Sequence, residues 1–198
     1  MLLISAYPCL GKTTISNLND KAKVFDRDFN ETRSRLGMNK SQIAAFHNAC
    51  CDIIQLQYEA NYHDVLFITD DEAFLSNLKK RGIKPILVFP NGFDDKYIEE
   101  YKGKVIARSG EAWWNRVMVN DMHSLKERIM LYKNDGYDIR LTDSKHPYIE
   151  DVILFPPNII TPKYIHKQLP TIKDFETNLR ESGNFELAEL LHKKSNRL

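Results

Sequence analysis

The chain has 198 residues, of which 42% are hydrophobic and 28% charged, and its formal net charge is +1. This composition excludes a disordered chain, and no apolar run approaches the ~20 residues that a membrane-spanning helix needs. The near-zero charge argues against a protein that binds nucleic acid mainly through a basic surface. Three cysteines are too few for a disulfide framework, and the N-terminal sequence lacks the charged region of a signal peptide. We therefore expect a cytoplasmic protein.

Short apolar runs alternate with segments of helical periodicity over most of the chain. Strands are predicted at residues 2–4, 65–68 and 85–89, and weaker ones at 24–25 and 137–141. The strong runs are apolar throughout, which is typical of strands that are covered on both faces. This alternation predicts an α/β fold with a parallel sheet and right-handed crossovers.

Three of the intervening segments carry apolar residues at helical spacing. The first begins after Ser41, a candidate N-cap, and the second, at residues 72–81, is followed by Gly82. The third and longest extends from Trp113 to Tyr132. Each of these segments is therefore expected to be one continuous helix.

The segment from Ala6 to Thr14 (AYPCLGKTT) matches the pattern G-x-x-x-x-G-K-[ST] except that Ala6 replaces the first glycine. Such a loop directs backbone N–H groups at phosphate oxygens, while Lys12 reaches the β- and γ-phosphates and the Thr13 hydroxyl holds Mg²⁺. A predicted strand precedes the loop and a helix can begin within it, as an anion site requires. We predict a nucleoside triphosphate site formed by Pro8, Cys9, Leu10, Gly11, Lys12, Thr13 and Thr14.

This loop and three later motifs resemble those of the P-loop kinases. The similarity is greatest to small phage-type nucleoside and deoxynucleoside monophosphate kinases, and more distant to phage polynucleotide kinase. The later motifs are Asp26-Arg27-Asp28-Phe29, Phe67-Ile68-Thr69-Asp70 and the segment from Gly82 to Pro90. For a phage-encoded protein, the expected compartment would be the host cytoplasm.

The resemblance implies a five-stranded parallel sheet with the first strand at its centre, in a three-layer α/β/α arrangement. It covers residues 1–155, in which residues 91–134 would include a short lid. Residues 156–198 are expected to form a proline-punctuated linker and a C-terminal helical hairpin. The resemblance also implies ATP and Mg²⁺ as cofactors.

Carboxylates follow two of the predicted strands. Asp26 and Asp28 lie at the end of the second strand, where a kinase needs a carboxylate to deprotonate or anchor the acceptor. Both remain candidates for catalysis and acceptor binding. Asp70 follows the third strand, where P-loop proteins place the acid that orients hydrated Mg²⁺. Either Asp70 or Asp71 could instead cap the helix that follows.

Phosphoryl transfer also needs cations over the developing charge. Six basic side chains in the lid and after the second strand are candidates: Lys102, Lys104, Arg108, Arg116, Arg33 and Arg35. Among these we favour Arg108 as a catalytic residue beside Lys12, and Arg33 as an acceptor-binding residue, because guanidinium binds phosphate bidentately.

Three functional hypotheses follow. The first is an ATP- and Mg²⁺-dependent kinase that phosphorylates a nucleotide or nucleoside, with a (deoxy)nucleoside monophosphate as the favoured acceptor. The second is a kinase for a polynucleotide 5′-hydroxyl or a hydroxymethylated base, with single-stranded or modified DNA as its partner. The third is a nucleotide-binding switch without kinase activity. The near-neutral charge favours the small acceptor, and the oligomeric state stays open.

Overall fold

The computed structural model describes residues 1–27, 37–163 and 165, with isolated positions at 177, 180, 185 and 189. The chain divides into two units, Met1–Ile160 and Thr161–Leu198, and the first of them contains the whole sheet. Asp28, Arg33 and Arg35 lie outside the described residues, as does most of the expected C-terminal hairpin.

Five strands in the described part of the chain form one parallel sheet in the order β2-β3-β1-β4-β5. They are β1 (Leu2–Ala6), β2 (Val24–Arg27), β3 (Val65–Ile68), β4 (Ile86–Pro90) and β5 (Ile139–Thr142). β1 pairs in parallel with β3 on one side and β4 on the other. The prediction of an α/β fold with five parallel strands and the first at the centre is therefore confirmed.

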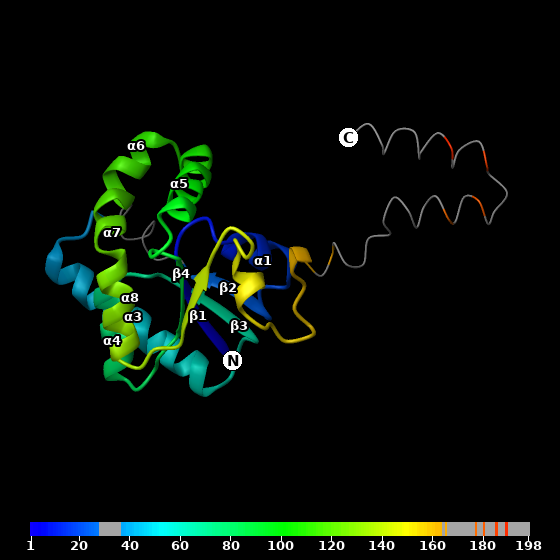
Figure 1. Ribbon diagram of the computed structural model, residues 1–198. Coiled ribbons are helices and arrows are strands. Elements are labelled where there is room, and N and C mark those ends of the chain that lie inside the picture. Colours follow the sequence, from blue (N-terminus) through cyan, green and yellow to red (C-terminus); the bar gives the residue numbers. More distant parts are fainter. Residues whose placement is uncertain are drawn as a thin grey trace. The chain divides into compact units, whose positions relative to one another are not determined.

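Helices cover both faces of this sheet. Figure 1 shows α1 (Lys12–Leu18) on one side, and α3 (Lys40–Glu59), α4 (Glu72–Lys80) and α8 (Leu125–Asn134) on the other. The connection from β4 to β5 also contains α5 (Asp95–Ser109), α6 (Glu111–Trp113), the π-helical turn η1 (Trp114–Met118) and α7 (Val119–His123). The short helix α9 (Ile149–Val152) follows β5. No helix in the described ranges is both long and apolar enough to cross a membrane.

The starts of α3 and α4 are determined by side-chain caps. The predicted N-cap at Ser41 is wrong, because the Asn39 side chain accepts a hydrogen bond from the Gln42 N–H and the Asn39 N–H donates to the Gln42 side-chain oxygen. This reciprocal capping box begins the helix at Lys40. At α4, the Asp71 carboxylate accepts from the Phe74 N–H at 2.9 Å. Asp71 is therefore the acid that caps this helix.

The single helix expected between Trp113 and Tyr132 is wrong. The segment instead holds part of α6, the turn η1, α7 and most of α8. α7 ends at His123. The hydroxyl of the next residue, Ser124, donates back to the Asn120 carbonyl at 3.4 Å, a bond that competes with the helical hydrogen bonds. Apolar spacing continues across this break, because the side chains on both sides of it still face the core.

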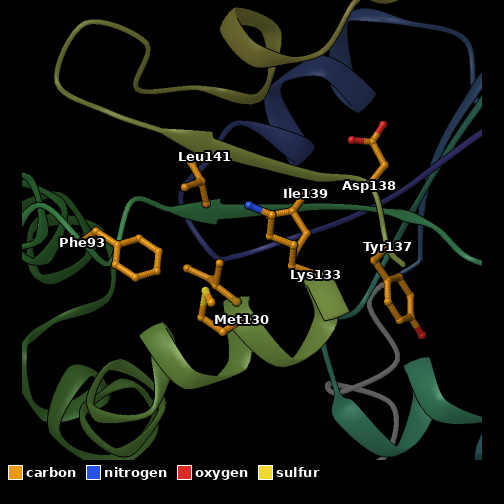
Figure 2. A pocket seen from close by; sticks show the side chains of 8 residues that line it. Phe93, Met130, Lys133, Tyr137, Asp138, Ile139 and Leu141 are labelled. Atoms are coloured by element: carbon orange, nitrogen blue, oxygen red, sulfur yellow. The ribbon is translucent and has the colours of Figure 1, made fainter. Parts of the chain in front are cut away.

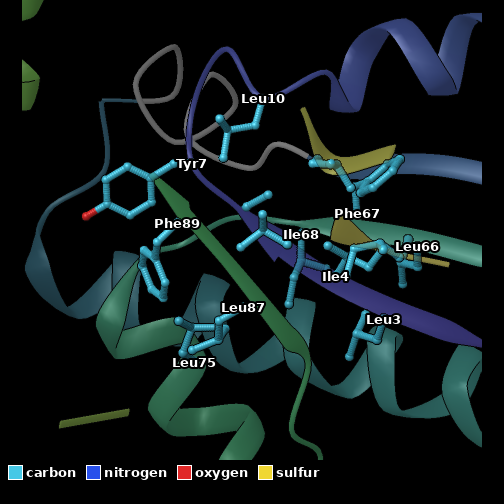
Figure 3. Packing of buried hydrophobic residues seen from close by; sticks show 14 of the residues in the cluster. Leu3, Ile4, Tyr7, Leu10, Leu66, Phe67, Ile68, Leu75, Leu87 and Phe89 are labelled. Atoms are coloured by element: carbon cyan, nitrogen blue, oxygen red, sulfur yellow. The ribbon is translucent and has the colours of Figure 1, made fainter. Parts of the chain in front are cut away.

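The core lies between the sheet and its helices. Figure 3 shows Leu75 of α4 beside Leu87 of β4, and Phe89 of the same strand beside Tyr7. Ile4 of β1 and Phe67 of β3 are paired across the sheet and belong to the same core cluster. The ring of Tyr7, directly after β1, is fully buried and packs edge-on against Phe89 with centroids 5.1 Å apart. The core therefore holds the first residue of the loop that leaves the central strand.

Candidate functional site

The loop after β1 lies at the carboxyl edge of the sheet. From β1 the chain continues to β2, whereas from the neighbouring strand β3 it continues to β4, on the other side of β1. The chain therefore changes direction between β1 and β3. In open α/β sheets, ligands bind outside the carboxyl ends of the strands at such a switch point.

The backbone of this loop contains a row of hydrogen-bond donors for which the described residues supply no acceptor. Tyr7 donates to the Val88 carbonyl at 3.1 Å, and Ile15 donates to the Gly11 carbonyl at 3.1 Å. Between them, the N–H groups of residues 9–14 have no acceptor among the described residues. Cys9 and Gly11 have left-handed φ values of 60° and 102°. Successive N–H groups in such alternating backbone conformations form anion-binding concavities.

The carbonyl groups of the same loop are, in contrast, occupied by neighbouring elements. The Tyr101 hydroxyl on α5 donates to the Pro8 carbonyl at 2.8 Å, and the Ile149 N–H donates to the Leu10 carbonyl at 2.9 Å. Burial raises the pKa of Tyr101 well above its ordinary value, so the hydroxyl stays protonated as a donor. Neighbouring elements thus hydrogen-bond to the carbonyl groups of the loop, whereas nothing in the described part of the chain accepts from its N–H groups at residues 9–14.

Two side chains at the start of α1 complete the loop. The Lys12 ammonium donates to the Ala6 carbonyl, so the side chain folds back over the loop. The Thr13 hydroxyl donates to the Asp26 carboxylate at 3.3 Å. The structure therefore brings a predicted Mg²⁺ ligand together with a carboxylate that was predicted to act on the acceptor.

Asp70 follows β3 and is partly buried. Burial raises the pKa of its carboxyl above the ordinary value, while the positive charges of Lys12 and Arg128 oppose this effect. Asp71 is engaged in capping α4, so Asp70 is the acid whose charge interacts with Lys12. The hydrogen-bond partner of Thr13 is nevertheless Asp26.

A buried arginine that we did not predict also belongs to this region. Arg128 on α8 donates to the Tyr7 hydroxyl at 2.7 Å and to the Asp70 carbonyl at 3.4 Å. Its Nε lies 2.9 Å from a carboxylate oxygen of Glu72. Sequence reasoning took this stretch as an apolar stripe, although an arginine three residues after buried Leu125 was a sign of an internal charge.

Of the lid cations, Arg108 contacts the loop. Its Nη1 lies 3.5 Å from the Sγ of Cys9. Lys104 lies over the ring of Tyr148, with 5.3 Å between the ammonium and the centroid. The Lys102 Nζ lies 3.8 Å from the Glu99 Oε2, and the side chain of Arg116 is exposed in η1. The structure thus brings one of the preferred cations, Arg108, to the loop, whereas Arg33 lies outside the described residues.

Within the described part of the chain, no group of three or more His, Cys, Asp or Glu side chains is arranged to hold a metal ion. Comparison of the chain with family models, with curated proteins and with solved structures finds no match. The functional argument therefore depends on the geometry of the loop and its neighbours.

Proposed function

We propose that the protein is a P-loop phosphotransferase, an ATP- and Mg²⁺-dependent kinase that acts on a nucleotide or nucleoside, with a (deoxy)nucleoside monophosphate as the favoured acceptor. The observation that carries the proposal is the row of N–H groups at residues 9–14, which have no acceptor among the described residues and follow the central strand. Residues 9–12 are buried or half-buried. Backbone donors in such positions are rarely left without partners, so a row of them indicates an anionic ligand.

A polyphosphate suits this loop better than a single anion does. The N–H groups extend over residues 9–14 and continue into the start of α1, where the helix dipole adds positive potential. Lys12 would exchange the Ala6 carbonyl for oxygens of the β- and γ-phosphates. One flexible ammonium and a row of amides together offer donors to the oxygens of a nucleoside triphosphate, and Mg²⁺ would offset part of the remaining charge.

The contact between Thr13 and Asp26 supports a Mg²⁺ site. Mg²⁺ keeps several waters and takes one or two carboxylates together with substrate phosphates, so it needs no cage of protein ligands. The Thr13 hydroxyl and the Asp26 carboxylate, 3.3 Å apart, supply oxygens of the kinds that this ion prefers. Bound Mg²⁺ would neutralise charge on the transferred phosphoryl group. Asp70 would act through water, and Asp28 stays a candidate general base.

Arg108 supports transfer rather than binding alone. Its guanidinium lies at Cys9, beside the row of free N–H groups, and extends from the last turn of α5. A cation that approaches from outside the loop can stabilise charge that develops during transfer. A protein that only binds nucleotide needs no such cation, so this contact favours the kinase over the switch.

Radiolabelled ATP and Mg²⁺, offered with a panel of acceptors, test the proposal. The panel holds nucleosides, nucleoside monophosphates, and oligonucleotides with a 5′-hydroxyl or a hydroxymethylated base. We expect label on a mononucleotide, and a loss of roughly 100-fold or more in rate for Lys12→Ala. The matched control is Lys80→Ala, which removes an exposed lysine of α4. Label on an oligonucleotide would mean that the acceptor is DNA and not a mononucleotide. Unchanged ATP affinity in Lys12→Ala would overturn the assignment of the loop as the phosphate site.

A further inference from the structure

The strand β5 lies at one edge of the sheet, and some of its backbone N–H and C=O groups are directed away from β4. Leu87 and Asn91 donate to the carbonyls of Asp138 and Thr142, each at 2.9 Å. Since successive residues of a strand direct their backbone groups to opposite edges, Ile139 and Leu141 direct theirs away from β4. No further strand lies beyond β5 among the described residues.

The two faces of β5 differ in character. Figure 2 shows Tyr137, Ile139 and Leu141 on the side of α8 and Asp138 pointing to the other side. The apolar side chains border a cavity of about 360 Å³, whose rim includes Phe93 and Met130. Both of these rim residues are half exposed, at 51% and 48%. An open edge beside exposed apolar side chains is a surface suited to pairing with another strand.

The charges on the opposite face alternate along the strand. The Arg140 Nε lies 2.9 Å from the Asp138 carboxylate, and both side chains are exposed. A strand with an acid and a base two residues apart is complementary to an antiparallel copy of itself. Pairing about Ile139 sets Arg140 opposite the partner's Asp138, and the reverse pair follows from the two-fold symmetry.

We propose that β5 forms a two-fold dimer interface, in which it pairs antiparallel with β5 of a second copy about an axis at Ile139. In this register the Ile139 N–H and C=O groups bond with the partner's Ile139. The Leu141 N–H reaches the partner's Tyr137 carbonyl, while the Tyr137 N–H is already bonded to Tyr132 at 3.0 Å. The apolar face gains contacts of Ile139 with the partner's Ile139.

The neighbouring register is disfavoured by charge. An axis at Arg140 sets Arg140 opposite the partner's Arg140, and like charges directly opposite each other destabilise a strand pair. The alternation of charge on one face therefore selects the axis at Ile139, and the apolar row on the other face is compatible with it. An unrelated peptide strand would have to match both faces by chance, whereas a second copy matches them by symmetry.

Charge reversal tests the interface by light scattering and sedimentation of the full chain at micromolar concentration. We expect the wild type to be dimeric, and Arg140→Asp and Asp138→Arg each to be monomeric. The double variant Asp138→Arg/Arg140→Asp restores the pairs and should restore the dimer. Lys80→Asp on α4 is the matched control and should stay dimeric. A monomeric wild type, or a single reversal that leaves the dimer intact, would overturn the proposal.

Disulfide trapping tests the register and does not depend on the charge variants. In a Cys9→Ser background, Ile139→Cys should cross-link on mild oxidation, because directly paired residues of this type lie ~5.5 Å apart between Cα atoms. Arg140→Cys should not, since it faces the partner's Asp138. Cross-linking at residue 140 but not at 139 would contradict the axis. Antiparallel pairing leaves both carboxyl edges outside the interface, so kinase activity does not enter either test.

Discussion

The guanidinium of Arg128 donates to the Tyr7 hydroxyl at 2.7 Å and lies over the same ring, 5.6 Å from its centroid. Burial raises the pKa of Tyr7, so its hydroxyl remains protonated and can accept this bond. Asp121 on α7 lies 3.6 Å from the same guanidinium. Through Arg128, the end of the β4–β5 connection is linked to the first residue of the proposed phosphate loop.

The Tyr7→Phe substitution tests whether this link positions the loop. The variant keeps the ring in the core but leaves a buried arginine donor without one acceptor, which costs about 1–3 kcal/mol of unfolding free energy. We expect weaker ATP binding as well as lower stability, measured by calorimetry and by denaturant unfolding. Tyr137→Phe is the matched control, because it removes a buried hydroxyl that bonds to Leu75. Equal ATP affinities in the two variants would mean that the link serves only the core.

A glycine pair tests the conformation of the loop. Gly11 has a φ of 102°, and a Cβ there would lie 3.8 Å from the Tyr148 side chain, an ordinary contact. Gly11→Ala is therefore strained by its backbone rather than by crowding, at a cost of about 1–2 kcal/mol. We expect at least a tenfold loss of ATP affinity. Gly103→Ala, in α5 with open space around it, should instead stabilise the protein by about 1 kcal/mol. An unchanged affinity in Gly11→Ala would argue against the loop geometry.

The raised pKa of the Asp70 carboxyl predicts that the stability of the protein depends on pH. Because burial raises its pKa in the folded protein, the folded state binds the proton more tightly than the unfolded state does. The stability gained by protonating the Asp70 carboxyl is complete below the unfolded pKa of ~3.9 and is lost as the pH rises through the folded pKa. At neutral pH, Asp70→Asn should therefore raise the Tm and flatten the pH dependence of stability above pH ~4.

The comparison for that experiment is Asp71→Ala, which removes the cap of α4. It should lower the unfolding free energy by about 1 kcal/mol at neutral pH. A fall in Tm for Asp70→Asn, similar to that of the capping variant, would mean that the Asp70 carboxylate stabilises the fold.

The contact between Thr13 and Asp26 predicts a defect specific to Mg²⁺. Thr13→Val and Asp26→Asn each remove an oxygen ligand or its charge, so the Mg²⁺ concentration for half-maximal activity should rise at least tenfold. ATP binding without the ion should change little. Ser76→Ala, which removes an exposed hydroxyl of α4, is the control and should leave both quantities as they are. Loss of metal-free ATP binding in Thr13→Val would indicate damage to the loop instead.

Strands β3 and β4 were predictable because their side chains are apolar on both faces, as in the fully buried run Val65–Ile68. Apolar spacing could not locate the break at Ser124, where a hydroxyl bond to the backbone interrupts the helix without changing the buried side. Arg128 was missed for a related reason, because its buried partners Tyr7 and Asp70 come from distant parts of the chain. The loop at residues 9–14 was predictable, since its chemistry lies in consecutive residues.

The central claim is that the N–H groups of residues 9–14 bind the phosphates of a nucleotide. Titration of ¹⁵N-labelled protein with Mg²⁺ and ATP, followed by amide NMR, measures this directly. The account predicts that the largest amide shifts fall within residues 9–14, with Gly11 and Lys12 among them, and that they saturate together. Shifts that leave this loop unchanged while other residues respond, or no shifts at all, would contradict it.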